Sequence, residues 1–196
     1  MKSYKTNLGL LLLATMLVLP FTACDDDPSS VDEGPGEEEL ITLIRLTLTE
    51  LDAQGNATTN TTSVSWEDAD GEGGNAPTIG TLSLAAGTSY SGTIELLDTT
   101  QNPPEDITEE VEEEAEEHQF FYELSGSGAA RVTVTITDED ANNLPVGLEY
   151  LVEVSAGGSD TASLNVVLSH YDEGPKNGTD RSDESDIDID IPVNIQ

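Results

Sequence analysis

Basic residues are scarce in this chain. Its 196 residues include six Lys and Arg against 40 Asp and Glu, which gives a formal net charge of −34. So little positive charge excludes nucleic acid and anionic bilayer surfaces as electrostatic partners, because both are bound through basic side chains. The charge favours cations or basic proteins as ligands, or it serves solubility alone. Repulsion between like charges also predicts a monomer.

Cysteine and long apolar runs are lacking as well. Cys24 is the single cysteine, so no disulfide can form within the chain. The apolar run from Leu8 to Leu19 is about a dozen residues long, whereas a helix needs about 20 to span a bilayer. The run follows Lys2 and Lys5 and precedes Cys24, which is the order of parts in a secretory signal peptide.

A cysteine directly after such a run looks like the lipidation site of a bacterial lipoprotein. We therefore expect residues 1–23 to be a signal peptide that is cleaved before Cys24, with Cys24 acylated and inserted in the outer membrane. Display on the cell surface and display on the periplasmic face both stay open. Phe21 departs from the Leu, Val or Ile usual at its position, so an ordinary secretory signal is the alternative.

Acidic residues, Pro and Gly dominate the next segment. Residues 24–39 show no apolar period and contain Pro28 and Pro35, which predicts an extended, flexible tether. The chain from Cys24 onward holds four basic and 40 acidic residues, a formal charge of −36. Residues 40–196 are predicted to form one domain.

Within residues 40–196, apolar side chains recur at every second position, as in half-buried strands. The clearest segments are 44–49, 132–137, 148–154, 162–168 and 187–195, and weaker ones are 61–66, 79–85, 88–97 and 119–124. The fold class predicted is all-β, an antiparallel β-sandwich of about nine strands. One short acidic helix is expected at 107–118, with Asp106 as its N-cap.

The segment ITEEVEEEAEEHQFFY (107–122), with SWEDADGEGG before it and DIDIPVNI after it, resembles a family of small acidic lipoproteins of Bacteroidetes. Members of that family are sometimes assigned a type 1 periplasmic-binding fold. Such a fold needs alternating strands and helices, and the period-two pattern argues against it. The resemblance implies a location in the cell envelope and implies no activity. The aspartates at 25–27 resemble the export signal of surface lipoproteins from the same bacteria.

If the strands run alternately up and down, the connections alternate between two ends. One end then receives segments 68–77, 98–118, 138–145 and 171–186, which with Glu67 hold 23 acidic residues. The other end holds three, Glu50, Asp52 and Asp160. Both histidines, His118 and His170, fall at the acidic end. This arrangement predicts an acidic pole that binds cations or a cationic ligand.

Three sets of side chains at this pole are candidate metal ligands. His118 and His170 could bind a divalent transition metal together with carboxylates. The oxygens of Asp138, Asp140 and Asn142 have the spacing of a calcium loop, with Asn143 where Gly is usual. Asp68 and Asp70 form a shorter turn of the same kind. Solvated acidic loops and hairpin turns without any ion are the alternative for all of them.

The sequence contains no recognisable catalytic set, because neighbours such as Ser169 and His170 do not make a triad by adjacency. We therefore expect a non-enzymatic protein, and an outer-membrane receptor is a candidate partner if the protein assists uptake. A structural or adhesive sandwich without a small ligand is the alternative. Carbohydrate binding would need exposed aromatic rings. The candidates are Trp66, Phe120, Phe121, Tyr122 and Tyr171.

Overall fold

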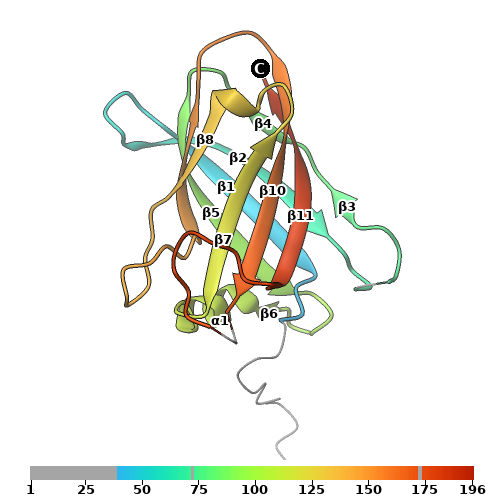
Figure 1. Cartoon of the computed structure of the whole chain (residues 1–196). Coiled ribbons are helices and arrows are strands. Elements are labelled where there is room, and N and C mark those ends of the chain that lie inside the picture. Colours follow the sequence, from blue (N-terminus) through green and yellow to red (C-terminus); the bar gives the residue numbers. More distant parts are fainter. Residues whose placement is uncertain (1–38, 72, 172–173) are drawn as a thin grey trace, which may run out of the picture. The chain divides into compact units, whose positions relative to one another are not determined.

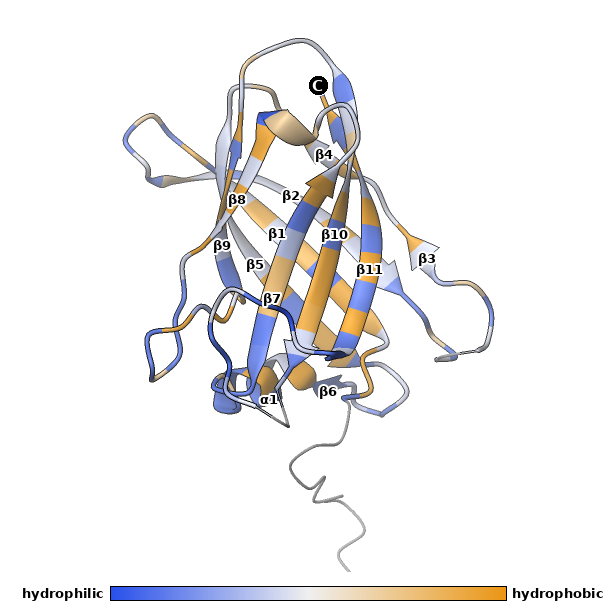
Figure 2. Ribbon diagram, in the orientation of Figure 1, coloured by the Kyte–Doolittle hydropathy of each residue, from blue (hydrophilic) through white to orange (hydrophobic). Residues whose placement is uncertain are grey.

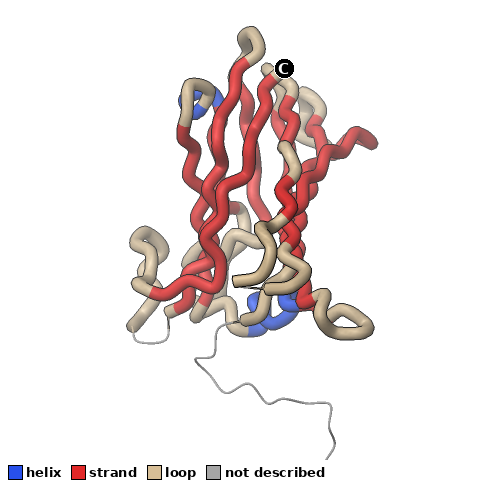
Figure 3. Tube along the Cα trace, turned by 90° about the vertical axis from the view of Figure 1, so that its right-hand side faces the viewer, coloured by secondary structure: helices blue, strands red, loops and turns tan. Residues whose placement is uncertain are grey.

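The structure is a computed structural model that describes residues 39–71, 73–171 and 174–196. These residues form two packed β-sheets and one α-helix, so the predicted all-β sandwich is confirmed (Figure 1). Figure 3 shows the strands in two layers. The predicted signal peptide, Cys24 and the predicted tether up to residue 38 lie outside the described residues.

The larger sheet has seven strands. In spatial order they are β3 (Thr78–Ile79), β2 (Ala57–Glu67), β1 (Leu43–Leu51), β5 (Ser89–Asp98), β9 (Glu149–Val154) and β8 (Val132–Ile136), and β6 (Glu105–Asp106) pairs with β5. The smaller sheet has four strands, in the order β4 (Leu82–Leu84), β11 (Glu184–Ile195), β10 (Asp160–His170) and β7 (His118–Ser125).

Eleven strands replace the nine that the sequence predicts, for two local reasons. The predicted strand at 79–85 is divided between the sheets, since Ile79 pairs with Trp66 in the larger sheet and Leu84 pairs with Ile195 in the smaller one. The chain crosses from one layer to the other between β3 and β4, and β4 consequently runs parallel to β11. The second addition is β6, a two-residue pairing at the end of β5.

The apolar faces of both sheets meet in one core. Leu46 and Leu48 of β1 belong to the same buried cluster as Val166 and Leu168 of β10. Figure 2 shows the apolar residues alternating with polar ones along the strands. Each such side chain contributes about 1.5–3 kcal/mol when it is fully removed from water, so this core is the main source of stability.

The predicted helix is present but ends early. α1 spans Ile107–Glu113, and Asp106 caps it by accepting a hydrogen bond from the Thr108 N–H at 3.0 Å. Ile107 and Val111 are buried in the core. The acidic residues after Glu113 oppose the helix dipole, which explains why residues 114–117 form a turn instead of continuing the helix.

Successive strands alternate in direction along the sandwich, except that β3 and β4 run the same way, as do the short β6 and β7. Neighbours in space are not always neighbours in sequence. Leu43 at the start of β1 pairs with Glu67 at the end of β2 and with Leu97 near the end of β5. His118 at the start of β7 pairs with His170 at the end of β10. The connections from 68 to 77, 99 to 117, 137 to 148 and 171 to 183 therefore reach one end, where Figure 1 shows α1 and β6. We call it the acidic end.

Candidate metal centre

Two histidines face each other at the acidic end of the smaller sheet. His118 is the first residue of β7 and His170 the last of β10, and the two are directly opposite in the antiparallel register. Residues opposite each other in such a pair point to the same side of the sheet. Here that side is the core side, which His118 shares with Phe120 and His170 shares with Leu168. The imidazole rings stack with centroids 4.4 Å apart.

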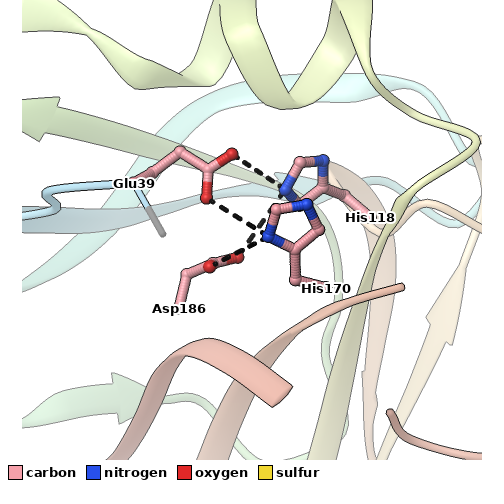
Figure 4. Close-up of side chains that lie close together, drawn as sticks. All are labelled: Glu39, His118, His170 and Asp186. Carbon is pink, nitrogen blue, oxygen red and sulfur yellow. Dashed lines mark ion pairs between the residues drawn. The ribbon is translucent and has the colours of Figure 1, made fainter. Parts of the chain in front are cut away.

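Two carboxylates complete the cluster (Figure 4). Glu39, which precedes β1, places Oε1 3.0 Å from His118 Nε2 and Oε2 3.9 Å from His170 Nδ1. Asp186 of β11 places Oδ2 3.6 Å from His118 Nε2 and Oδ1 3.4 Å from His170 Nδ1. The side chains are almost fully enclosed, with exposed fractions of 0% for His118 and Asp186, 4% for His170 and 6% for Glu39.

A β-bulge turns Asp186 toward the histidines. Leu168 pairs with Ile187, but the next residue, Ser169, pairs with Ser185, so Asp186 is an extra residue on β11. Strict alternation would place Asp186 on the solvent face with Asp188 and Asp190, because Ile187 faces the core. An extra residue shifts the register and re-aims a side chain, which explains why this aspartate points inward.

A backbone carbonyl fixes the orientation of the His118 ring. Its Nδ1 lies 3.2 Å from the backbone oxygen of Glu114, just after α1. A carbonyl oxygen can only accept, so Nδ1 carries the proton and Nε2 is the atom that faces the carboxylates. Metal-binding histidines are commonly held in this way, since the second nitrogen donates to a carbonyl or carboxylate.

The cluster leaves buried polar atoms without hydrogen bonds. His118 Nε2, Glu39 Oε2 and both carboxylate oxygens of Asp186 are buried and make none. Although Nε2 lies only 3.0 Å from Glu39 Oε1, the contact lacks the alignment of a hydrogen bond. An unsatisfied buried polar group costs about 1–3 kcal/mol, and more when it is charged. A cation or protons between these four atoms could offset that cost.

Electrostatics at the cluster shift the pKa values of the two acids in opposite directions. Burial, and then the negative charge of Glu39, raise the pKa of Asp186 to about 8. Burial also acts to raise the pKa of Glu39, but contact with His118 lowers this pKa on balance. Burial acts to lower the pKa of His118, yet Glu39 and Asp186 outweigh it and raise this pKa. Protons therefore occupy the site near neutral pH.

The arrangement fits a metal ion. One ligand atom from each of the four residues can be chosen so that all four lie within 4.8 Å of one another, and this is the one such group found among the described residues. A tetrahedral zinc ion with bonds of about 2.0–2.1 Å places its ligand atoms about 3.3 Å apart. The nitrogen–oxygen distances of 3.0–3.9 Å in the cluster are close to that spacing.

The structure brings His118 and His170 together but leaves the other predicted ligands outside the cluster. Asp138 accepts the N–H groups of Gly147 and Leu148, both at 2.8 Å. Asp140 accepts the N–H groups of Asn142 and Leu144 and lies 2.9 Å from Lys176 Nζ.

The turn from Asp138 is therefore held by its own backbone. Asn142 is exposed and donates to Glu116, and Asn143 adopts φ 61°, the left-handed geometry expected there. These backbone hydrogen bonds engage carboxylate oxygens that a calcium ion would need as ligands. They favour the alternative interpretation of this segment, a hairpin turn without an ion.

The second predicted turn also uses its acids locally. Asp70 accepts the backbone and side-chain N–H groups of Asn75 at 3.0 and 2.7 Å. The backbone N–H of Asp68 donates to Thr42, and its Oδ1 is buried without a hydrogen bond. Neither side chain belongs to the histidine cluster.

The acidic end also has a groove of about 450 Å³ between α1 and the β8–β9 connection. Its lining includes Glu112, Asp138, Asp140 and Leu148. Its two aspartates are those already bonded to the backbone and to Lys176. The groove thus offers solvated glutamates and an apolar floor.

The five candidate aromatic residues do not form an exposed platform. Phe120 is buried, and Trp66 and Tyr122 pack against the core. Phe121 lies 5.7 Å from the guanidinium of Arg181, and the Tyr171 hydroxyl donates to Asp180. This placement disfavours the carbohydrate hypothesis, which requires rings open to solvent.

Two residues of the cluster, Glu39 and Asp186, were not among the predicted ligands. Glu39 falls in the predicted tether, yet its side chain is buried in the site. Asp186 occupies a position that alternation assigns to the solvent face. The histidines carried a usable signal: each continues the apolar parity of its strand, which predicts a core-facing side chain.

Comparison with protein-family models, with characterised proteins and with solved structures finds no match for this chain. None of the helices in the described residues has the length and apolar character needed to cross a membrane.

Proposed function

We propose that this protein binds one divalent transition-metal ion, with zinc as the simplest candidate, through His118, His170, Glu39 and Asp186. The single observation that carries the proposal is the convergence of these four residues, in which buried atoms of His118, Glu39 and Asp186 make no hydrogen bond. A cation at their centre would satisfy all of these atoms at once, whereas their burial without one is costly.

The ligand types favour a transition metal over calcium. Calcium takes six to eight oxygen ligands, and two of the four groups here are imidazoles. Imidazole and carboxylate together suit zinc, iron or nickel. Two carboxylates also balance the charge of a divalent ion when both histidines are neutral, which matters in a site with almost no exposed surface.

Four protein ligands would fill a tetrahedral coordination shell. Catalytic zinc sites keep one position open for water or substrate, and structural sites do not. The enclosed cluster therefore supports a non-enzymatic role, in which the ion stabilises, signals or is carried. The resemblance and the predicted lipidation of Cys24 extend the proposal to a monomeric protein anchored in the outer membrane, with assistance to an uptake receptor as a candidate role.

The alternative is a structural or adhesive sandwich whose cluster is filled by protons. The raised pKa of Asp186 favours it, because a protonated carboxyl beside Glu39 and His118 would also neutralise the site. The two functions differ in whether zinc displaces those protons.

Calorimetric titration decides between them. Residues 25–196 contain the whole described part, with its own closed core, and can be titrated with zinc, iron(II) and calcium after chelation and dialysis. We expect micromolar or tighter zinc binding, at a ratio of one to one, with protons released. Asp188→Asn, which removes a neighbouring exposed acid of β11, should bind zinc as the wild type does. Zinc affinity no better than about 1 mM would leave the structural alternative.

A further inference from the structure

We infer that Glu39 gates the metal site, so that the ion enters and leaves through a local movement of residues 39–41 while the other three ligands stay in place. This inference rests on the proposed function and adds the route of metal exchange. It starts from the enclosure of the site, because a metal ion cannot reach ligands with exposed fractions of 0–6% unless some segment opens.

Both histidines are held by the sheet. His118 and His170 pair with each other, and β10 lies between β7 and β11 with ladder bonds on both sides. The backbone oxygen of His118 also accepts a hydrogen bond from the buried Lys176 Nζ at 2.9 Å. Moving either histidine would break several buried hydrogen bonds, which makes this opening expensive.

Asp186 is held on both sides in sequence. Its neighbours Ser185 and Ile187 pair with Ser169 and Leu168 of β10. The bulge leaves Asp186 itself out of the register, but its backbone cannot leave without separating β11 from β10.

Glu39 is attached far more weakly. Among the described residues, no backbone hydrogen bond joins residues 39–41 to another residue, and the first is that from the Thr42 N–H to the Leu97 oxygen at 3.0 Å. Leu40 is 51% exposed, so it adds little packing. The side chain of Ile41, 7% exposed, is the apolar contact that keeps the segment against the core.

Two matched isoleucines separate a gate at Glu39 from a gate at Asp186. Ile41 lies two residues after Glu39, Ile187 lies one residue after Asp186, and both are buried in the same core. Neither is a ligand. Zinc-loaded protein (residues 25–196) is mixed with an excess of a chromogenic chelator, and the rate of zinc release is followed for Ile41→Ala, Ile187→Ala and the wild type.

We expect Ile41→Ala to release zinc at least tenfold faster than the wild type and Ile187→Ala to change the rate less than threefold. Zinc uptake should accelerate in Ile41→Ala as well, because a gate speeds both directions and leaves the dissociation constant nearly unchanged. Hydrogen exchange of the metal-free protein should show the amides of residues 40 and 41 exchanging ahead of those of 119–121.

The outcomes separate the two proposals. Zinc binding with equal acceleration in both alanine variants, or a larger effect of Ile187→Ala, overturns the gate and leaves the proposed function intact. A wild type that binds no zinc overturns both. If an alanine variant fails to fold, Ile41→Val and Ile187→Val repeat the comparison with smaller cavities, and the same inequality decides it.

Discussion

Two acidic clusters lie at the same end of this sandwich, and they are built in opposite ways. Around Asp140, Oδ1 accepts two backbone N–H groups and Oδ2 forms an ion pair with the ammonium of Lys176 at 2.9 Å. This ammonium donates to the backbone oxygens of Ala115 and His118. Around Asp186, neither carboxylate oxygen has a hydrogen bond, although the side chain is equally enclosed. The difference teaches that acidic composition does not locate a site here. The cluster around Asp186 is distinguished by several buried polar atoms that lack hydrogen bonds and converge on one another.

The largest effect should come from breaking the satisfied cluster. Asp140→Asn leaves the buried Lys176 ammonium without its counter-charge, which typically costs about 3–5 kcal/mol. Zinc affinity, measured by calorimetry on protein that is still folded, should stay within threefold of the wild type. Urea unfolding gives the stability. A decrease in the free energy of unfolding of less than about 1 kcal/mol would show that the ion pair of Asp140 and Lys176 does not stabilise the fold.

The unsatisfied cluster should respond in the reverse way. Asp186→Asn removes a buried acid that is costly to ionise, so the metal-free variant should be as stable as the wild type at pH 8 or more stable. The same change should abolish zinc stabilisation, which for the wild type is about 2.7 kcal/mol at a hundredfold excess over the dissociation constant. Thermal unfolding with and without zinc measures both, with Asp188→Asn as the control. Retained zinc stabilisation in Asp186→Asn would remove this residue from the ligand set.

The stability of the protein without metal should depend on pH in the direction set by the shifted pKa values of this cluster. The folded pKa of Asp186, about 8, exceeds its unfolded value of about 3.9, so its contribution is lost as pH rises toward 8. The raised pKa of His118 acts in the same direction, with stability lost as pH rises through it. The lowered pKa of Glu39 acts oppositely, but only at acidic pH.

Between pH 6 and pH 9, stability in the presence of a chelator should therefore fall, by about 2–3 kcal/mol. Saturating zinc should flatten or reverse this slope, because the ion needs deprotonated ligands. Urea unfolding at four pH values, with and without zinc, gives both slopes. Parallel slopes would contradict a metal that competes with protons at this cluster.

Calcium should have the smallest effect. In the turn from Asp138 to Leu144, the carboxylates already accept hydrogen bonds from backbone N–H groups. Millimolar calcium should thus raise the melting temperature no more than sodium chloride at matched ionic strength, since both act by screening. A selective calcium shift that Asp138→Asn abolishes would restore the calcium loop that the sequence predicts.

Much of the fold could be predicted from the chain alone. Nine alternating segments recur as strands, because burial on one face imposes a period of two on any such sheet. Asp106 was predicted as the helix N-cap and is one. The division of segment 79–85 between the two sheets could not be predicted, since its alternation is the same whichever partner strand it meets.

The candidate site was predictable in part. The direction of successive strands places His118 and His170 at one end, and the parity of each strand turns them toward the core. Asp138 and Asp140 were predicted from ligand spacing, which is shared by turns that bind nothing. Spacing carries no information about which backbone N–H groups a carboxylate will meet.

By itself the sequence determined the sandwich, the acidic end and the place of both histidines there, because period and strand direction are local properties of the chain. The pairing of His118 with His170 across β7 and β10 was decided by the tertiary structure. Only the tertiary structure decided that Glu39 and Asp186 are the acids beside them. A one-residue bulge in β11 and the course of the chain before β1 place these two carboxylates in the site. Both depend on contacts between residues about 70 or more positions apart, or on register, and neither leaves a period in the sequence.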